Sequence, residues 1–349
     1  MERIKQIYSL NQNAMISAKN RWDSIAKPLG SFGELESLII RTAGIQESEN
    51  VDISGRTVVV MCADHGIVEE GVTQTDAEVT AICARSIASG SSNVNVISNQ
   101  FGGDVLAVDI GMRSDVEHPA LLNRKIAYGT RNFTKEPAMT TEQALRAVTV
   151  GIDIVQDLKA QGAKLLLTGE MGIGNTTPTS AIASVLLLKS PKEVTGRGAG
   201  LSSEGLCRKI KVIEQGIALH TPAADDPIGL LAALGGLEIA GMTGIFLGGA
   251  IYRIPVVIDG VISAVSACLA QAVCPECVNF MLASHTSGEP AGEGLLQLLG
   301  LHPVIRAGLR LGEGTGALLL IPLLEGALAL YNKSHRFDDI AIMRYTEQT

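Results

Sequence analysis

The sequence has few aromatic residues and no excess of positive charge, and each of these features excludes some classes of protein. Only 3% of the 349 residues are aromatic, whereas 46% are hydrophobic and 38 are glycine. That balance is typical of tightly packed α/β folds with many glycine-bearing turns. A net charge of −8 gives no basic surface for nucleic acid, so we expect no nucleic-acid partner. An anionic ligand would have to be held by backbone amides and a few local cations.

Targeting signals and membrane-length apolar runs are also lacking. The N-terminal residues MERIKQ begin a polar segment without the apolar core of a signal peptide. Apolar runs such as 256–262 are interrupted by Asp259 and Gly260, short of the roughly 18 residues that a membrane span needs. We therefore expect a cytoplasmic protein without a membrane partner.

Cysteine is sparse, and its pattern does not favour a metal site. The six cysteines lie mostly in apolar stretches, as reduced, buried thiols do. Cys274 and Cys277 form one CxxC pair, and Cys268 alone does not complete the four ligands of structural zinc. We expect neither a metal nor a cofactor.

The two common nucleotide-binding patterns are missing as well. No segment matches the P-loop pattern GxxxxGK[ST], and the glycines of 169–178 do not give GxGxxG. This disfavours a kinase or a nicotinamide-dependent oxidoreductase, the strongest rival enzyme classes for this kind of chain. A non-catalytic small-molecule-binding protein, or a catalytically silent subunit of a heterodimer, remains an alternative.

Strand and helix signals alternate through the middle of the chain. Continuous apolar runs predict buried strands over 57–63, 104–111, 164–170 and 255–260. Helical patterns cover 79–88, 141–161, 179–188, 203–220 and 236–249. Strands separated by helices favour a mostly parallel sheet with helices on both faces, because such crossovers are right-handed. Ligands of such folds gather at the carboxyl ends of the strands, where Asp64, Glu170 and Asp259 fall.

The two ends of the chain predict helices without intervening strands. We expect these helices to pack together as a small helical domain formed by residues 1–55 with 318–349. Residues 56–317 would then form the large α/β catalytic domain.

The segment 310–317 (RLGEGTGA) contains the first candidate for a catalytic base. Glu313 lies between Gly312 and Gly314, just before an apolar helix. Desolvation of this carboxylate is costly, and the glycines let a substrate approach it closely. The alternative is an ordinary helix N-terminus at which Glu313 complements the helix dipole.

The segment 169–178 (GEMGIGNTTP) follows a strand and begins a helix, where free amides and the helix dipole can bind an anion. Its hydroxyl and amide side chains are neutral donors for phosphate oxygens. An ordinary strand-to-helix turn, capped by threonine, explains the pattern equally well. Two further loops, 196–200 (GRGAG) and 284–288 (SHTSG), add a guanidinium, hydroxyls and an imidazole.

Taken in order along nearly the whole chain, these segments resemble the motifs of the nicotinate-nucleotide:dimethylbenzimidazole phosphoribosyltransferase family. The matching segments are 27–36 (KPLGSFGELE), 62–66 (CADHG), 169–178, 196–198 (GRG), 259–260 (DG), 284–285 (SH) and 310–317. The resemblance implies a Rossmann-like sheet with a small helical domain, in a dimer. It also implies transfer of phosphoribose from nicotinate mononucleotide to an aromatic base, giving an α-linked nucleotide for cobamide biosynthesis.

The same resemblance implies roles for individual residues. Glu313 would take the proton of the incoming nucleophile, and Glu170 and Lys209 would assist. The expected substrate-binding residues are Asp64, His65, Thr75, Cys83, Gly172, Gly174, Asn175, Thr176, Thr177, Arg197, Gly198, Asp259, Ser284, His285, Ser287, Gly312 and Gly314.

Two positions depart from the family pattern beside the expected acceptor ring. Cys83 stands where a member of the family has glutamine, and Thr75 where that member has serine. Loss of the amide makes the pocket less suited to hydrogen-bonding a second ring nitrogen. We therefore hypothesise an altered acceptor, namely another benzimidazole, a purine or a phenol. The alternative function is a phenol- or p-cresol-specific enzyme that works as a heterodimer with a paralogue.

Overall fold

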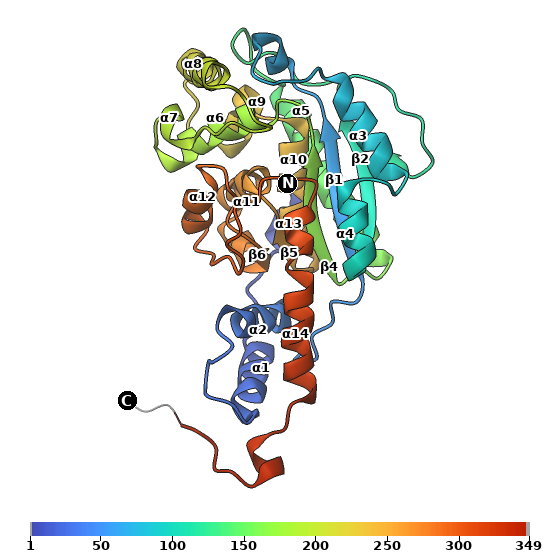
Figure 1. Ribbon diagram of the computed structural model, residues 1–349, viewed down its shortest axis with the longest axis vertical. Coiled ribbons are helices and arrows are strands. Elements are labelled where there is room, and N and C mark those ends of the chain that lie inside the picture. The colour runs from blue at the N-terminus through green and yellow to red at the C-terminus, as the bar shows by residue number, and fades with distance from the viewer. Residues whose placement is uncertain (1, 347–349) are drawn as a thin grey trace.

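A six-stranded, all-parallel sheet forms the centre of the computed structural model, which describes residues 2–346. The strands are β1 (Arg56–Ala63), β2 (Asp104–Gly111), β3 (Leu121–Asn123), β4 (Leu165–Met171), β5 (Val256–Ile258) and β6 (Met281–Ala283). Their order is β3-β2-β1-β4-β5-β6 (Figure 1). The chain runs outward from β1 in one direction and returns to continue from β4 in the other. The carboxyl ends of β1 and β4 therefore flank the switch point at which doubly wound folds bind ligands.

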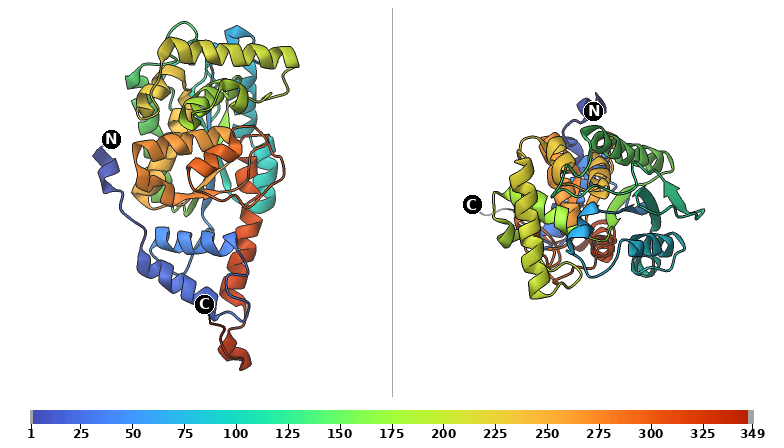
Figure 2. Two further views of the ribbon diagram at one scale, coloured as in Figure 1. Left: turned by 90° about the vertical axis from the view of Figure 1, so that its left-hand side faces the viewer. Right: turned by 90° about the horizontal axis from the view of Figure 1, so that it is seen from above.

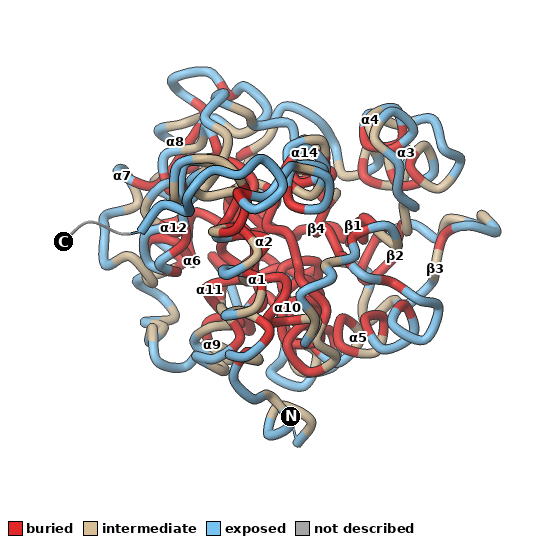
Figure 3. Tube along the Cα trace, turned by 90° about the horizontal axis from the view of Figure 1, so that it is seen from below, coloured by how far each residue is buried: buried red, intermediate tan, exposed pale blue. Residues whose placement is uncertain are grey.

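Helices cover both faces of the sheet, as expected from the alternating signals. On one face lie α3 (Glu78–Ala88), α4 (Asn93–Phe101) and α13 (Thr315–Leu318), and on the other α5 (Thr141–Ala160), α10 (Leu237–Tyr252) and α11 (Val261–Val273). Alternate side chains of β1 join the two cores: Val58 and Val60 pack with the first group, and Val59 and Met61 with the second. Figure 2 shows this layering from two sides, and Figure 3 shows the buried stretches along β1, β4 and α10.

Facing glycines bring α5 and α10 unusually close. A Cβ atom at Gly151 of α5 would lie 2.1 Å from the carbonyl oxygen of Gly241, and one at Gly244 would lie 2.0 Å from that of Val148. Only residues without side chains permit this approach. It holds α10 between α5 and the sheet, and it explains part of the high glycine content.

The remaining helices extend this core. They are η1 (Glu2–Gln6), η2 (Gly66–Glu70), α6 (Thr176–Leu187), α7 (Pro191–Val194), α8 (Ser203–His220), α9 (Pro227–Leu234), η3 (Pro275–Phe280), α12 (Gly292–Leu298) and η4 (Phe337–Ile340). In Figure 1, α6, α7, α8 and α9 gather on one side of the upper end of the molecule.

The terminal segments meet at the opposite end of the molecule (Figure 1), where α1 (Gln12–Ser24) and α2 (Glu34–Gln46) pack beside α14 (Ile321–Lys333). The rings of Trp22 and Tyr331 lie 5.1 Å apart, and the Arg21 guanidinium lies 4.3 Å from the Tyr331 ring. An ion pair of 2.6 Å between Arg56 and Glu325 connects α14 to the start of β1. The outer ends of the expected helical domain, residues 1 and 347–349, lie outside the described residues.

One apolar stretch is longer than we expected from the sequence. The segment Thr315–Lys333, which spans α13 and α14, has 19 residues and is apolar enough to cross a membrane by length and composition alone. Half of the apolar window within it is buried inside the molecule.

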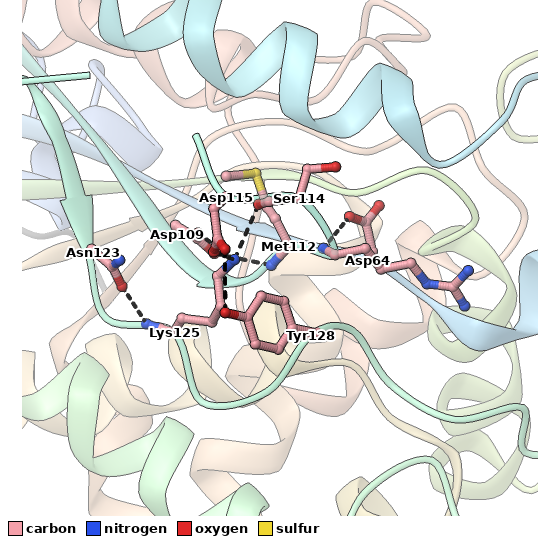
Figure 4. Close-up of polar contacts among 9 residues, drawn as sticks. Asp64, Asp109, Met112, Ser114, Asp115, Asn123, Lys125 and Tyr128 are labelled. Carbon is pink, nitrogen blue, oxygen red and sulfur yellow. Dashed lines mark hydrogen bonds and ion pairs between the residues drawn. The ribbon is translucent and has the colours of Figure 1, made fainter. Parts of the chain in front are cut away.

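A charged cluster closes the carboxyl end of β2 (Figure 4). The Lys125 ammonium lies 3.3 Å from the buried Asp109 and 2.7 Å from the exposed Asp115. The same ammonium lies 4.3 Å from the centre of the Tyr128 ring. Asp109 also accepts a hydrogen bond of 2.9 Å from the Met112 amide. This cluster fixes the chain between β2 and β3.

Candidate active site

A cavity of ≈ 200 Å³ opens at the carboxyl ends of β4 and β5, beside the switch point. Three loops complete its wall: 72–75 after β1, 197–201 before α8, and 310–313. Of the expected site residues, the wall includes Glu170, Glu313, Thr75, Gly172, Gly174, Asn175, Thr176, Arg197, Gly198, Asp259, Ser287 and Gly312. Segments that are distant in the sequence therefore meet here, and Glu313 faces the 169–178 turn across one cavity.

The backbone of residues 312–314 is left-handed at three consecutive positions. The φ angles are +87° at Gly312, +61° at Glu313 and +88° at Gly314. A left-handed glutamate is strained by roughly 1–2 kcal/mol, so its surroundings must hold it. Asp259 does so from the end of β5, because its carboxylate accepts hydrogen bonds from the amides of Gly314 at 3.3 Å and Ala317 at 2.8 Å.

The Glu313 side chain is 8% exposed and lies at the start of α4. Its Oε2 accepts a hydrogen bond of 3.4 Å from the amide of Val94. Burial raises the pKa of Glu313, and the hydrogen bond from Val94 opposes that rise. A carboxylate whose pKa lies closer to neutral pH is a stronger base.

Glu170 is a strongly perturbed carboxyl group in the wall. Burial raises its pKa to about 8, and the negative charges of Asp259 and Glu238 add to the rise. Asn175 donates a very short hydrogen bond to Glu170 Oε2, which opposes it. Glu170 is thus poised to hold or release a proton near neutral pH.

The Glu170 carboxyl lies directly against the backbone of Gly312. A Cβ atom at Gly312 would lie 2.6 Å from Glu170 Oε1. Gly312→Ala should therefore lower kcat/KM on the order of 10²-fold, because it displaces the Glu170 carboxyl by a fraction of an ångström or more. Steady-state kinetics would measure the loss.

Gly308→Ala is the matched control for this variant. Gly308 is also left-handed, with φ +64°, but nothing lies within 4 Å of a Cβ atom there. It should reproduce the backbone strain without the loss of activity. Equal losses in both variants would contradict the importance of the contact with Glu170.

Lys209 of α8 is fully buried behind the 169–178 turn, the candidate phosphate-binding segment. Its Nζ donates a hydrogen bond of 2.7 Å to Thr176 Oγ1 and one of 3.4 Å to the carbonyl oxygen of Gly196. Burial lowers the pKa of Lys209 to about 8, while the negative charge of Glu289 opposes the shift. Lys209 thus supports Thr176 from behind and brings a positive charge to the N-terminus of α6.

Among residues 2–346, several expected site residues do not line the cavity and lie behind its wall. They are Asp64, His65, Cys83, Thr177, Lys209, Ser284, His285 and Gly314. Asp64 accepts a hydrogen bond of 2.8 Å from the Arg113 amide, as Figure 4 shows. Ser284 donates one of 2.6 Å to the Ile258 carbonyl oxygen, and its hydroxyl lies 2.9 Å from His285 Nδ1. The positions of these residues indicate support of the wall.

The cavity also contains residues that the sequence patterns did not single out. Thr73, Gln74, Glu289 and Arg310 line it, and the Val94 amide contacts Glu313 at the start of α4. The capping box formed by Ser92 and Asn95 is the sequence signal that could have placed a helix start there.

Within residues 2–346 the structure contains no group of three or more His, Cys, Asp or Glu side chains arranged to hold a metal ion. Cys277 is buried and Cys274 is half-buried, both as free thiols.

Comparisons with known proteins identify the family of this chain. A family model described as "Phosphoribosyltransferase" matches residues 7–342. The nicotinate-nucleotide–dimethylbenzimidazole phosphoribosyltransferase of Ruminiclostridium cellulolyticum is 44% identical over 344 residues, which cover 99% of this chain and 98% of that protein. The enzyme of the same name from Clostridium acetobutylicum is 42% identical over 342 residues, or 98% and 97% of the two chains.

Solved structures give the same result. The crystal structure of CobT from Thermus thermophilus is similar to this fold with a TM-score of 0.90 and 36% sequence identity, covering 95% of this chain and 100% of that one. With full-length relatives in sequence and in structure, the chain belongs to the CobT-type nicotinate-nucleotide–dimethylbenzimidazole phosphoribosyltransferase family.

Proposed function

We propose that the protein transfers phosphoribose from nicotinate mononucleotide to dimethylbenzimidazole, releasing nicotinate and an α-linked ribotide for cobamide biosynthesis. The observation that carries the proposal is that the Glu313 carboxylate and the 169–178 turn line one cavity. A base and an anion-binding turn on facing walls suit a reaction that joins a phosphorylated sugar to a ring nitrogen. Relatives more than 40% identical carry the corresponding name.

The reaction breaks one bond and forms one. The bond between C1′ of the ribose and the ring nitrogen of nicotinate breaks, and its electron pair leaves with nicotinate, which neutralises the positively charged ring. The acceptor nitrogen attacks C1′ from the opposite face. Glu313 takes the proton from the N–H of the acceptor, a contribution of roughly 10²- to 10⁴-fold.

In this proposal a separate set of groups binds the donor nucleotide. The amides at the start of α6 and the hydroxyl of Thr176 bind the phosphate, since helix N-termini favour anions. Lys209 supplies a positive charge through its contact with Thr176. Arg197, from the loop before α8, lines the same wall. Glu170 holds or releases a proton beside the reacting centre.

The direct test is an assay of the purified chain with nicotinate mononucleotide and dimethylbenzimidazole. We expect equal amounts of nicotinate and α-ribotide by chromatography, and no turnover of ATP or of a nicotinamide dinucleotide. Binding of both substrates without release of nicotinate would favour the alternative of a silent subunit or a non-catalytic binding protein.

The acceptor end of the cavity is the place to test the alternative acceptors. Thr75 lines the wall, and Cys83 is half-buried on α3. Burial raises the pKa of the Cys83 thiol and the negative charge of Glu313 adds to the rise, which is consistent with a position near the base. The names of the relatives favour dimethylbenzimidazole over a phenol.

Cys83→Gln should shift the acceptor preference toward benzimidazoles, since the amide can hydrogen-bond a second ring nitrogen. One neutral hydrogen bond changes the ratio of kcat/KM values by roughly 2- to 10-fold. Competition between dimethylbenzimidazole, adenine and phenol, with the protein alone and with any paralogue, measures the ratio. Cys274→Gln, at a half-buried cysteine outside the cavity wall, should leave it unchanged.

We also propose the domain boundaries 56–317 and 1–55 with 318–349, a dimer of identical or paralogous chains, and a cytoplasmic location. The contact of α1 and α2 with α14 supports the helical domain. Analytical ultracentrifugation of the purified chain, with and without a paralogue, measures the oligomeric state.

A further inference from the structure

A buried polar pair outside the cavity wall joins β1 to α10. His65 follows β1, and Glu238 lies in the first turn of α10. Their side chains are 1% and 0% exposed, and Nε2 of His65 lies 3.0 Å from Oε1 of Glu238. The proposed reaction gives neither residue a role.

Stability alone does not account for this pair. Among residues 2–346, neither nitrogen of His65 and neither carboxylate oxygen of Glu238 has a hydrogen bond of acceptable angle. Burial of polar or charged side chains costs free energy, several kcal/mol for an ion, and only good hydrogen-bonding geometry offsets that cost. Apolar residues of similar volume would hold β1 to α10 at least as well.

The position of the pair connects it to the cavity. Nε2 of His65 lies 3.2 Å from the place where a Cβ atom of Gly172 would be, and Asn175 Nδ2 lies 3.5 Å from that same point. The imidazole is therefore packed under the turn that begins at Gly172. Asn175 ends this turn and donates its hydrogen bond to Glu170.

The negative charge of Glu238 also acts on the pKa of Glu170. The carboxylate of Glu238 raises the pKa of Glu170, together with burial and the charges of Asp259 and Glu313. These carboxylates come from α10, from the end of β5 and from the 310–313 loop. The imidazole of His65 comes from the end of β1. Glu238 is thus one of the charges that decide the protonation state of Glu170.

We propose that His65 and Glu238 are positioning residues, a buried polar pair that supports the floor of the cavity from behind. The imidazole fixes the turn from Gly172 to Asn175, and Asn175 in turn fixes the carboxyl of Glu170. The carboxylate of Glu238 sets the charge on Glu170 without touching the substrate. This inference rests on the proposed function for its kinetic consequences, whereas its electrostatic consequence is measurable without substrate.

The test compares Glu238→Gln with the unaltered protein by carbon-13 NMR of labelled glutamate side chains. The Glu170 resonance is assigned by its loss in Glu170→Gln. Removal of the like charge should move the titration of Glu170 to lower pH than in the unaltered protein. An unchanged Glu170 titration would overturn the proposal.

The kinetic readout is the response of kcat/KM to the same variant. Displacement of the turn and of Glu170 should lower kcat/KM for nicotinate mononucleotide on the order of 10- to 100-fold. Glu170→Gln should abolish one limb of the pH profile of kcat/KM. In Glu238→Gln that same limb should shift to lower pH. If Glu238→Gln does not fold, His65→Gln combined with Glu238→Gln carries the test, because two facing amides bury no net charge.

Asp109→Asn is the matched control. It removes one charge of another buried pair at the end of a neighbouring strand, with Lys125 3.3 Å away, and neither residue lines the cavity. It should lower the thermal midpoint and leave the titration of Glu170 and kcat/KM unchanged. A merely structural role for His65 and Glu238 predicts this same result for Glu238→Gln. An inactive unaltered protein would overturn the proposed function, but the NMR titration would still decide the role of the pair.

Discussion

Glu313→Gln should fold normally and lose roughly 10²- to 10⁴-fold in kcat, the contribution of a positioned general base. The amide oxygen of glutamine can still accept the hydrogen bond from Val94, so the 312–314 backbone and α4 keep their contact. Only the ability to take a proton is removed. Glu313→Ala should be at least as impaired, since it also leaves the Val94 amide without its acceptor.

The measurement is steady-state release of nicotinate, with the thermal midpoint of each variant recorded in parallel. Glu293→Gln is the control, because Glu293 is an exposed glutamate of α12 that pairs with Arg306. Near-normal turnover by Glu313→Gln would exclude Glu313 as the base.

Lys209→Met should produce the second large effect, a loss of roughly 10- to 150-fold in kcat/KM for nicotinate mononucleotide. A hydrogen bond that involves a charged group contributes about 1.5–3 kcal/mol, and methionine fills a buried site of similar shape without the charge. The same substitution at Lys211, an exposed residue of the same helix, should leave kcat/KM unchanged.

The pH dependence of kcat/KM should identify Lys209 more directly. Because the pKa of Lys209 is lowered to about 8, its charge is present below that pH and is lost as pH rises through it. Affinity for the anionic donor should fall over the same range in the unaltered protein and should not fall in Lys209→Met. Glu170 also titrates near pH 8, so Glu170→Gln is needed to separate the two groups. Persistence of the descending limb in Lys209→Met would contradict the assignment.

The long elements were predictable because their patterns are strong. The buried runs predicted β1, β2, β4 and β5, the helical patterns predicted α3, α5 and α8, and the apolar, glycine-rich stretch 236–249 predicted α10, each near its observed bounds. The start of α6 was wrong by about one turn: we expected 179, and the helix begins at Thr176. Pro178 suggested a boundary, but a proline in the first turn of a helix forfeits no internal hydrogen bond.

The elements that were missed are short or lack a distinctive period. Strands β3 and β6 have three residues each, too few to show a pattern, and their structure depends on pairing with β2 and β5. Helix α11 is buried along most of its length, and the sequence patterns did not single it out. Helices α4, α9 and α12 were also not anticipated.

The sequence predicted which loops form the site, but not which of their residues line the cavity. Position at strand ends predicted that Glu170 and Asp259 would meet, and glycine spacing drew attention to Glu313. Nothing in the local sequence separates wall residues such as Ser287 from residues behind the wall such as Ser284, which lies three positions away. That distinction depends on how the strand ends turn, which is a property of the whole sheet.

The left-handed run at residues 312–314 also limits which mutations the gene can accept at these codons. Any single-base change that replaces glycine by another residue introduces a side chain. At position 312 that side chain meets Glu170, and at position 314 its Cβ atom would lie 2.6 Å from Val58 Cγ1. Only silent mutations are therefore harmless at these two codons. Evolution toward a new acceptor would have to proceed through other parts of the cavity, such as position 75 in its wall, while this left-handed segment stays the same.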